Sequence, residues 1–301
     1  MIVGWYVSLT DAQWARIEPL LPDRTPKRGG RWRDHRQVID AIAFKYRTGT
    51  PWMDLPERFG SWKGAHSRLR MWAIDDTWER VFVALLAQAD AEEDLDWVVA
   101  VDSTIVRAHQ HAAGARQKGP RRASRTHALG RSRGGLTTKI HLASDGRCRP
   151  LAFILTPGQA GDAPAFTQVM ATIRVTRPKG RPRTRPVVVP ADKAYSSRAI
   201  REHLRGRRIR AVIPQPADQI TNRRRLGSKG GRPPGFDREA YKQRNTVERC
   251  INKLKQWRGI ATRHDTTATA YQAALHHAAI HIWAARWDLD PGSWTPETLG
   301  S

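Results

Sequence analysis

The ten residues WVVAVDSTIV, at positions 97–106, constrain the fold of this chain most. They are rich in β-branched and apolar side chains and enclose one carboxylate, Asp102, so they predict a buried strand with an acid inside it. A buried carboxylate is costly unless it is paired or holds a metal ion. The alternative is an aspartate at a strand end that caps a loop. The residues before this run are typical of helices, and strands and helices alternate after it, which indicates an α/β domain behind a helical one.

Two further carboxylates follow runs of defined character. PVVVP, at 186–190, predicts a second buried strand, and Asp192 comes two residues after it. The stretch 241–257 has no glycine or proline and predicts a single amphipathic helix. At about 100° per residue, one charged stripe lies beside the apolar face of this helix. The residues of this stripe are Tyr241, Arg244, Glu248 and Lys255. The alternative is a solvated helix whose charges pair with one another.

These three carboxylates suggest one kind of chemistry. If the strands of Asp102 and Asp192 are parallel neighbours, both side chains lie at the same sheet edge, and Glu248 on a packed helix can reach it. Carboxylate oxygens suit Mg²⁺, with Mn²⁺ as a substitute. Two such ions can stabilise the attacking and leaving oxygens of a phosphoryl transfer. The pattern therefore predicts a nuclease or a strand-transferase.

The charge of the chain indicates a polyanionic partner. The formal net charge is +24 and the sequence pI is about 11.2, a balance that favours nucleic acid. Two basic segments, 115–133 and 217–236, are predicted to be loops that contact phosphates. The sequence shows no apolar run of bilayer length and no secretory signal, so we expect no membrane partner and a cytoplasmic, nucleoid-associated protein. The arginines singled out in the two loops are Arg121, Arg122, Arg223 and Arg224.

The first 92 residues are predicted to be helical. A short turn with glycine precedes a basic helical segment at 61–75, an order that resembles a helix-turn-helix. The alternative is a three-helix packing module with basic surface residues. The candidate DNA contacts of this segment are Lys63, His66, Arg68 and Arg70.

The middle of the chain predicts a hairpin and a helix. TTKIHLAS and LAFILTPG are separated by Asp145-Gly146, a turn signal, and read as antiparallel strands. Asp162 then stands where it could cap the helix that follows. Cys148 and Cys250 form no metal or redox motif and are expected to be reduced core thiols.

Taken together, these stretches resemble the bacterial insertion-sequence transposases of the DDE type, in the insertion sequence family five group. The resemblance covers nearly the whole chain and rests on LTDAQWARIEPLLP, YRTGTPWMDLPERFGSW, VDSTIVRAHQHAAGA, GRSRGGLTTKIHLA, LTPGQAGDAPAF, ADKAYSS, GSKGGRPPGFD and the Tyr-x2-Arg-x3-Glu-x6-Lys spacing that begins at Tyr241. It implies an RNase H-like α/β core with a mixed five-stranded sheet flanked by helices, at 93–288, between a helical DNA-binding domain at 1–92 and a tail at 289–301.

The resemblance also implies function. It assigns Asp102, Asp192 and Glu248 as the catalytic triad and the ligands of two Mg²⁺ ions. The expected activity is cleavage at the terminal inverted repeats of the element and joining of the 3′-OH ends to target DNA, by a homodimer or higher oligomer on paired ends. Pro190 departs from the pattern, because an apolar strand residue is expected there, and could bend that strand. The alternatives are an RNase H-like nuclease or resolvase without strand transfer, and an inactive transposase-derived DNA-binding protein.

Overall fold

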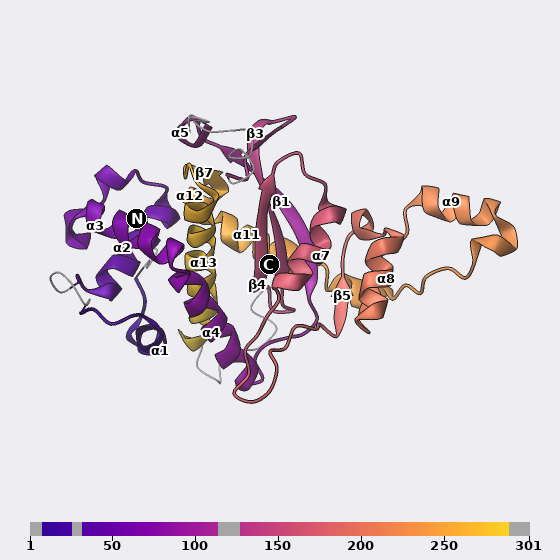
Figure 1. Ribbon diagram of the computed structural model, residues 1–301, viewed down its shortest axis with the longest axis horizontal. Coiled ribbons are helices and arrows are strands. Elements are labelled where there is room, and N and C mark those ends of the chain that lie inside the picture. The colour runs from indigo at the N-terminus through magenta and orange to yellow at the C-terminus, as the bar shows by residue number, and fades with distance from the viewer. Residues whose placement is uncertain (1–7, 26–31, 114–126, 289–301) are drawn as a thin grey trace, which may run out of the picture.

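The computed structural model describes residues 8–25, 32–113 and 127–288 (Figure 1). An N-terminal helical unit, a central sheet with helices packed on it, and a projecting arm follow one another along the longest axis of the molecule (Figure 1). The predicted loop arginines Arg121 and Arg122 lie outside the described residues.

The N-terminal unit is helical, as predicted. Thr10 and Gln13 form a capping box at the start of the first helix, and Asp34 accepts the amide of Gln37 at the start of the second. Gly49, with φ of +76°, ends the second helix in the left-handed conformation that glycine favours. The helices are α1 (Asp11–Ile17), α2 (His35–Thr48), α3 (Trp62–Ile74) and α4 (Thr77–Ala91), with 3₁₀ turns at Glu18–Leu20, Trp52–Asp54 and Glu57–Phe59.

The connection between α2 and α3 differs from the predicted helix-turn-helix. It runs over residues 49–61 and contains two 3₁₀ turns, whereas a helix-turn-helix has a turn of three or four residues. Pro51 and Pro56 each stand just before one of these turns and lack the amide proton that would continue a helix. The helical character of the unit is confirmed, but its connection is longer than predicted.

The central sheet has five strands and mixed direction, as predicted. β1 (Ala100–Ala108) pairs with β3 (Gly135–Ser144) antiparallel and with β7 (Thr262–Arg263) parallel. β4 (Pro150–Pro157) and the short β2 (Gly130–Ser132) both pair antiparallel with β3, on the edge away from β1. The β3–β4 pair is the predicted hairpin. Residues 130–132 were expected in a loop, but they extend this ladder as β2.

The second predicted aspartate strand lies outside this sheet. β5 (Val188–Pro190) and β6 (Arg210–Val212) form a separate parallel pair, joined to β1 and its preceding residues by isolated parallel bridges, Val98 with Val188 and Val101 with Ala191. β5 ends at Pro190, whose nitrogen cannot donate to a ladder. Ala191 still donates to the carbonyl of Val212 and pairs with Val101, so the proline does not separate this segment from β6 or β1.

Two helices cover the sheet around β1. α7 (Asp162–Thr172) and α11 (Asn245–Lys255) both pack on β1 and β3. The remaining helices of this part are α5 (Gln110–Ala113), α8 (Arg198–Gly206), α9 (Ala217–Arg225), α10 (Arg238–Lys242), α12 (Arg258–Ala261) and α13 (Ala268–Ala284), with 3₁₀ turns at Lys193–Tyr195, Gly227–Gly230 and Ala285–Asp288. No helix in the described part of the chain is long and apolar enough to cross a membrane.

Two helix predictions need correction. The stretch 241–257 is not one helix, because α10 ends at Lys242 and α11 begins at Asn245. At the break, the hydroxyl of Thr246 donates to the carbonyl of Gln243 (2.7 Å), where the backbone amide of Val247 would otherwise bond. The segment 217–236 is not entirely a loop, because α9 occupies its first half. α9 stands at the tip of the projecting arm (Figure 1).

One apolar core joins the helical unit to the sheet. α13 packs against α3, α4 and β4, and Trp72, Trp78 and Trp283 are fully buried along it. His276 lies against the rings of Phe82 and Phe153. Both cysteines are free and buried, as predicted. The N-terminal unit is therefore part of the same packed body as the sheet.

Candidate active site

The structure brings the first two predicted carboxylates level with one another. Val101 and Ala191 are partners in a parallel bridge, and the next residue of each segment is an aspartate, Asp102 or Asp192. Adjacent strands lie about 4.8 Å apart. Asp102 and Asp192 therefore extend from neighbouring segments at the same height, although 90 residues (192 − 102) separate them in sequence.

The third carboxylate faces the same place from α11. Glu248 is exposed and forms an ion pair with Arg244, with 2.9 Å between Arg244 Nη1 and Glu248 Oε1. The guanidinium of Arg244 also lies 5.7 Å from the ring centre of Tyr241. Arg244 thus links two other residues of the predicted stripe, Tyr241 and Glu248. The fourth, Lys255, is half-buried at the end of α11.

The electrostatics of Asp102 link all three acids. Burial raises the pKa of its carboxyl, the negative charges of Asp192 and Glu248 add to this, and the amide of Ser103 (2.8 Å) and the charge of Arg244 oppose it. A raised pKa means that the surrounding groups do not fully compensate the cost of burying the negative charge of this carboxylate. Such a group gains from a bound cation.

A polar cluster that the sequence did not predict lies on the other face of β1. Gly161, not Asp162, stands at the N-cap of α7, and the Asp162 carboxylate makes no cap bond there. It accepts hydrogen bonds from Ser103 Oγ (2.6 Å) and Lys139 Nζ (3.0 Å). Successive residues of a strand point to opposite faces, so Ser103 turns to α7 and Asp102 to α11. The predicted cap residue is therefore a member of this cluster.

Two more buried groups complete this cluster. His141 lies beside Asp162 (3.8 Å) and bonds to the hydroxyl of Thr156 (2.8 Å), and burial lowers its pKa to about 4, so the ring is neutral at pH 7. Burial also raises the pKa of Tyr195, whose amide donates to the carbonyl of Asp192. The alternation of Lys139 and His141 on a buried strand was the sequence signal for this cluster.

The balance of charges in the cluster favours an ionised Asp162. Burial acts to raise its pKa, but the hydrogen bonds from Ser103 and Lys139 outweigh burial and lower it. Asp162 therefore anchors the side chain of Ser103, while the amide of Ser103 holds a carboxylate oxygen of Asp102.

The donor set of the three acids suits a divalent ion, since it consists of carboxylate oxygens. Within the described ranges, no three acidic, histidine or cysteine side chains converge closely enough to hold a metal ion. Glu248 is engaged by Arg244, and its release would free the third ligand. The residues present fit such an ion in their chemistry, and the ion pair with Arg244 occupies one of the predicted ligands.

The other predicted contacts are scattered over the surface. Lys63 and Arg70 are exposed on α3, and His66 packs edge-on against Trp52. Arg68 does not fit its predicted role, because it is 9% exposed, bonds to the His35 ring (3.0 Å) and lies over Trp32. On the arm, Arg224 is exposed, whereas Arg223 bonds to the side chain of Gln215.

Comparison with known proteins covers both parts of the chain. Residues 9–82 match the family described as putative transposase of the IS4/5 family, and residues 93–283 match the transposase DDE domain. The chain is 40% identical over 109 residues to the uncharacterized protein y4sN of Sinorhizobium fredii, which covers 36% of this chain and 83% of that one. It is 32% identical over 148 residues to a putative transposase for insertion sequence element IS6501 of Brucella ovis, which covers 49% and 98%.

Among solved structures, the Mos1 transposase paired-end complex with left transposon end aligns over 91% of this chain and 83% of that one. The identity is 14% and the TM-score is 0.25, which is too low to carry an argument.

The mixed sheet with its flanking helices and level aspartates forms the α/β domain of a DNA-transferring enzyme of the DDE class. The chain belongs to the transposase DDE domain family, and it is an insertion-sequence transposase. Enzymes with this domain generally use divalent metal ions.

Proposed function

We propose that this transposase binds the terminal inverted repeats of its own element, hydrolyses the DNA at the element ends and joins the freed 3′-OH to target DNA. The level placement of Asp102 and Asp192, with Glu248 facing them, is the observation that carries this proposal. The name of one similar protein, a putative transposase for insertion sequence element IS6501, agrees with DNA as the substrate.

In this proposal Asp102, Asp192 and Glu248 hold two Mg²⁺ ions, with Mn²⁺ as a substitute. The ions supply Lewis-acid stabilisation of the attacking and leaving oxygens when bound. The residues of the chain orient the DNA. Arg244 can bind two oxygens of one phosphate, and Lys255 offers a compact charge about two turns beyond Glu248 on the same helix.

The remaining charges serve DNA binding in this proposal. Lys63, His66 and Arg70 on α3 contact the terminal repeat, and Arg223 and Arg224 on the arm contact phosphates without reading sequence. Arg121 and Arg122, which lie outside the described residues, are assigned to the same role. Paired element ends are held by a homodimer or a higher oligomer. We place the reaction in the bacterial cytoplasm, at the nucleoid.

The test is a cleavage and joining assay on oligonucleotides that carry the element ends. Asp102→Asn, Asp192→Asn and Glu248→Gln should each lower both steps at least about a hundredfold, because the charge that stabilises the transition state is lost. End binding should remain, and Asp218→Asn, a surface control on α9, should behave as wild type. Near wild-type nicking by Asp102→Asn would overturn the triad.

Two outcomes of the same assay would favour the alternatives. Metal-dependent cleavage without joining under any condition would indicate a nuclease or resolvase. Specific binding with no metal-dependent cleavage would indicate a DNA-binding protein derived from a transposase.

A further inference from the structure

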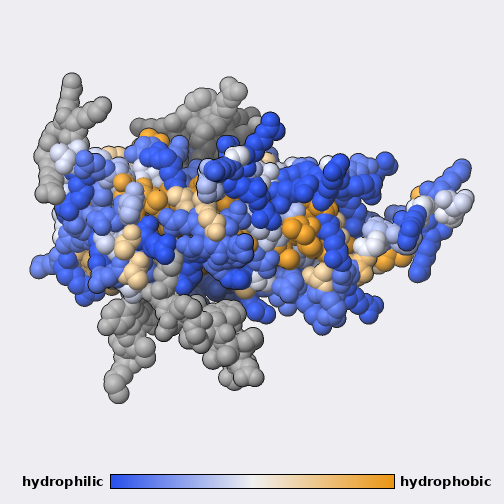
Figure 2. Space-filling view, turned by 90° about the horizontal axis from the view of Figure 1, so that it is seen from below, coloured by the Kyte–Doolittle hydropathy of each residue, from blue (hydrophilic) through white to orange (hydrophobic). Residues whose placement is uncertain are grey.

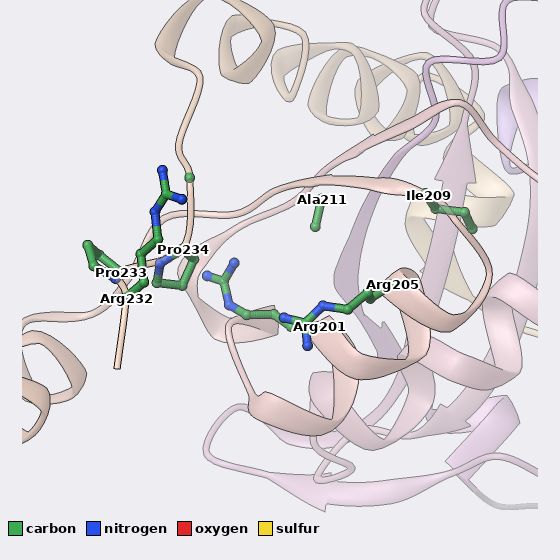
Figure 3. Close-up of a pocket in the computed structure, with 8 residues that line it drawn as sticks. Arg201, Arg205, Ile209, Ala211, Arg232, Pro233 and Pro234 are labelled. Atoms are coloured by element: carbon green, nitrogen blue, oxygen red, sulfur yellow. The ribbon is translucent and has the colours of Figure 1, made fainter. Parts of the chain in front are cut away.

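A cavity of about 420 Å³ lies at the base of the arm, away from the three carboxylates. Arg201 and Arg205 of α8 line one side, and Arg232 lines the other (Figure 3). Three guanidinium groups thus surround one hollow, and no acidic residue lines it. Anions are the ligands that such a lining favours.

Arg201 is the most constrained of the three. It is half-buried, and its guanidinium donates to the carbonyls of Ile213 (2.8 Å) and Ser196 (3.3 Å). Burial lowers its pKa, and no carboxylate in the described part of the chain forms an ion pair with it. A partly desolvated charge with only neutral acceptors is stabilised when an anion enters.

The other two arginines are available to a ligand. Arg205 and Arg232 are exposed, and the guanidinium of neither forms a hydrogen bond with a described residue. The nearest acid on α8, Glu202, forms its ion pair with Arg198 (2.7 Å). The charge of Arg205 also contributes to the lowered pKa of Glu202. Both guanidinium groups therefore have free donors.

The rest of the lining is apolar. Ile209 and Ala211 come from the segment leading into β6 and from β6 itself, and Pro233 and Pro234 face them across the cavity (Figure 3). Guanidinium groups beside small apolar surfaces match a sugar-phosphate chain, in which charged phosphates alternate with deoxyribose rings. A small inorganic anion would leave the apolar part unused.

The arm continues the positive charge of the cavity. It carries Arg224 and Arg225 at the end of α9 and Lys229 between α9 and Arg232, all exposed, and it extends beyond the body of the molecule (Figure 1). Figure 2 shows hydrophilic residues along the arm and hydrophobic ones near its base. A duplex that lies along the arm would reach the cavity with its backbone.

We propose that the cavity formed by Arg201, Arg205 and Arg232 is a second DNA site, which holds two successive phosphates of a duplex independently of its sequence. This inference rests on the proposed function, since it assumes that the transposase acts on DNA. It adds a contact remote from the carboxylates, so its loss should weaken binding without changing the chemistry at the bound end.

The first experiment measures binding of a random-sequence duplex as a function of salt. Each lost phosphate contact lowers the slope of log affinity against log salt by about one, so Arg205→Ala with Arg232→Ala should lower it by about two. Arg198→Ala, on the same helix but paired with Glu202, is the matched control and should lower it by much less. A slope equal to wild type in the double variant would overturn the proposal.

The second experiment locates the DNA directly. Gly235 lines the cavity, and a Cβ there meets nothing within 4 Å, so Gly235→Cys can carry a photo-crosslinker, while the native Cys148 and Cys250 are buried. It should crosslink to duplex DNA, and Thr176→Cys, exposed beside α4, should not. Equal crosslinking at both positions, or none at 235, contradicts the site. Both readouts are independent of cleavage, so an inactive triad would refute the proposed function alone.

Discussion

Arg244 and Glu248 form an ion pair across one turn of helix at the centre of the candidate site, with 2.9 Å between guanidinium and carboxylate. Glu248 is also the third proposed metal ligand. The pair is partly exposed, and such pairs at this spacing contribute only about 0.3–0.5 kcal/mol. It is therefore weak enough for a metal ion and a DNA phosphate to separate, each taking one partner.

The first prediction follows from this competition. Arg244→Ala should bind Mn²⁺ about two- to tenfold more tightly in the absence of DNA, because Glu248 is released and a nearby positive charge is removed. Titration calorimetry on the purified protein measures this affinity. Lys242→Ala, a surface control paired with Glu239, should bind as wild type does. Weaker metal binding by Arg244→Ala would contradict this prediction and show that the ion pair between Arg244 and Glu248 favours metal binding.

The second prediction concerns Asp162. Asp162→Asn should lower the free energy of unfolding by about 1–3 kcal/mol, since Lys139 keeps its charge but loses a charged acceptor. It should also lower cleavage about tenfold or more, because Ser103 no longer fixes Asp102 firmly. Chemical denaturation and single-turnover cleavage give the two values.

If Asp162 only stabilises the fold, a different result is expected. In that case the variant, once folded, would need no more Mg²⁺ for half-maximal cleavage than wild type. A positioning role should raise this requirement.

The third prediction compares two lysines of α11. Lys255 lies on the stripe of Glu248, whereas Lys253 points about 140° away from it. Lys255→Ala should impair cleavage or joining strongly and Lys253→Ala weakly, because only the first can contact a phosphate near the cleaved bond. Single-turnover assays on a pre-formed end complex decide this, with folding checked by circular dichroism. Equal losses would mean that the stripe is not the DNA face.

The fourth prediction concerns acid stability. Burial lowers the pKa of His276 to about 4, so the folded protein keeps this ring neutral while the unfolded chain protonates it below about 6.5. The stabilising contribution is therefore complete above pH 6.5 and is lost as pH falls towards 4, by up to about 1.4 kcal/mol per pH unit. Denaturant unfolding at several pH values should show a shallower fall for His276→Gln. An unchanged pH dependence in this variant would exclude His276 as a source of the acid sensitivity.

Spacing along the chain determined the local features. The caps of α1 and α2, the β3–β4 hairpin and the four-residue interval from Arg244 to Glu248 depend on neighbours within a few residues, whose angles are set by helix and strand geometry. The three carboxylates were visible for the same reason, because each lies on or beside a recognisable element. The continuous helix over 241–257 failed because a side-chain hydrogen bond at Thr246 competes with the helical backbone, and periodicity does not weigh that competition.

Only the tertiary structure decided which distant residues meet. The bridge of Val101 with Ala191, the bond between Ser103 and Asp162, and the burial of Arg68 join residues from different elements. The energies of these contacts depend on how helices and strands pack against one another, and local sequence preferences do not specify that packing. The sequence alone therefore predicted three acids as a site, while the packing of α7 and α11 on β1 determined which groups surround them.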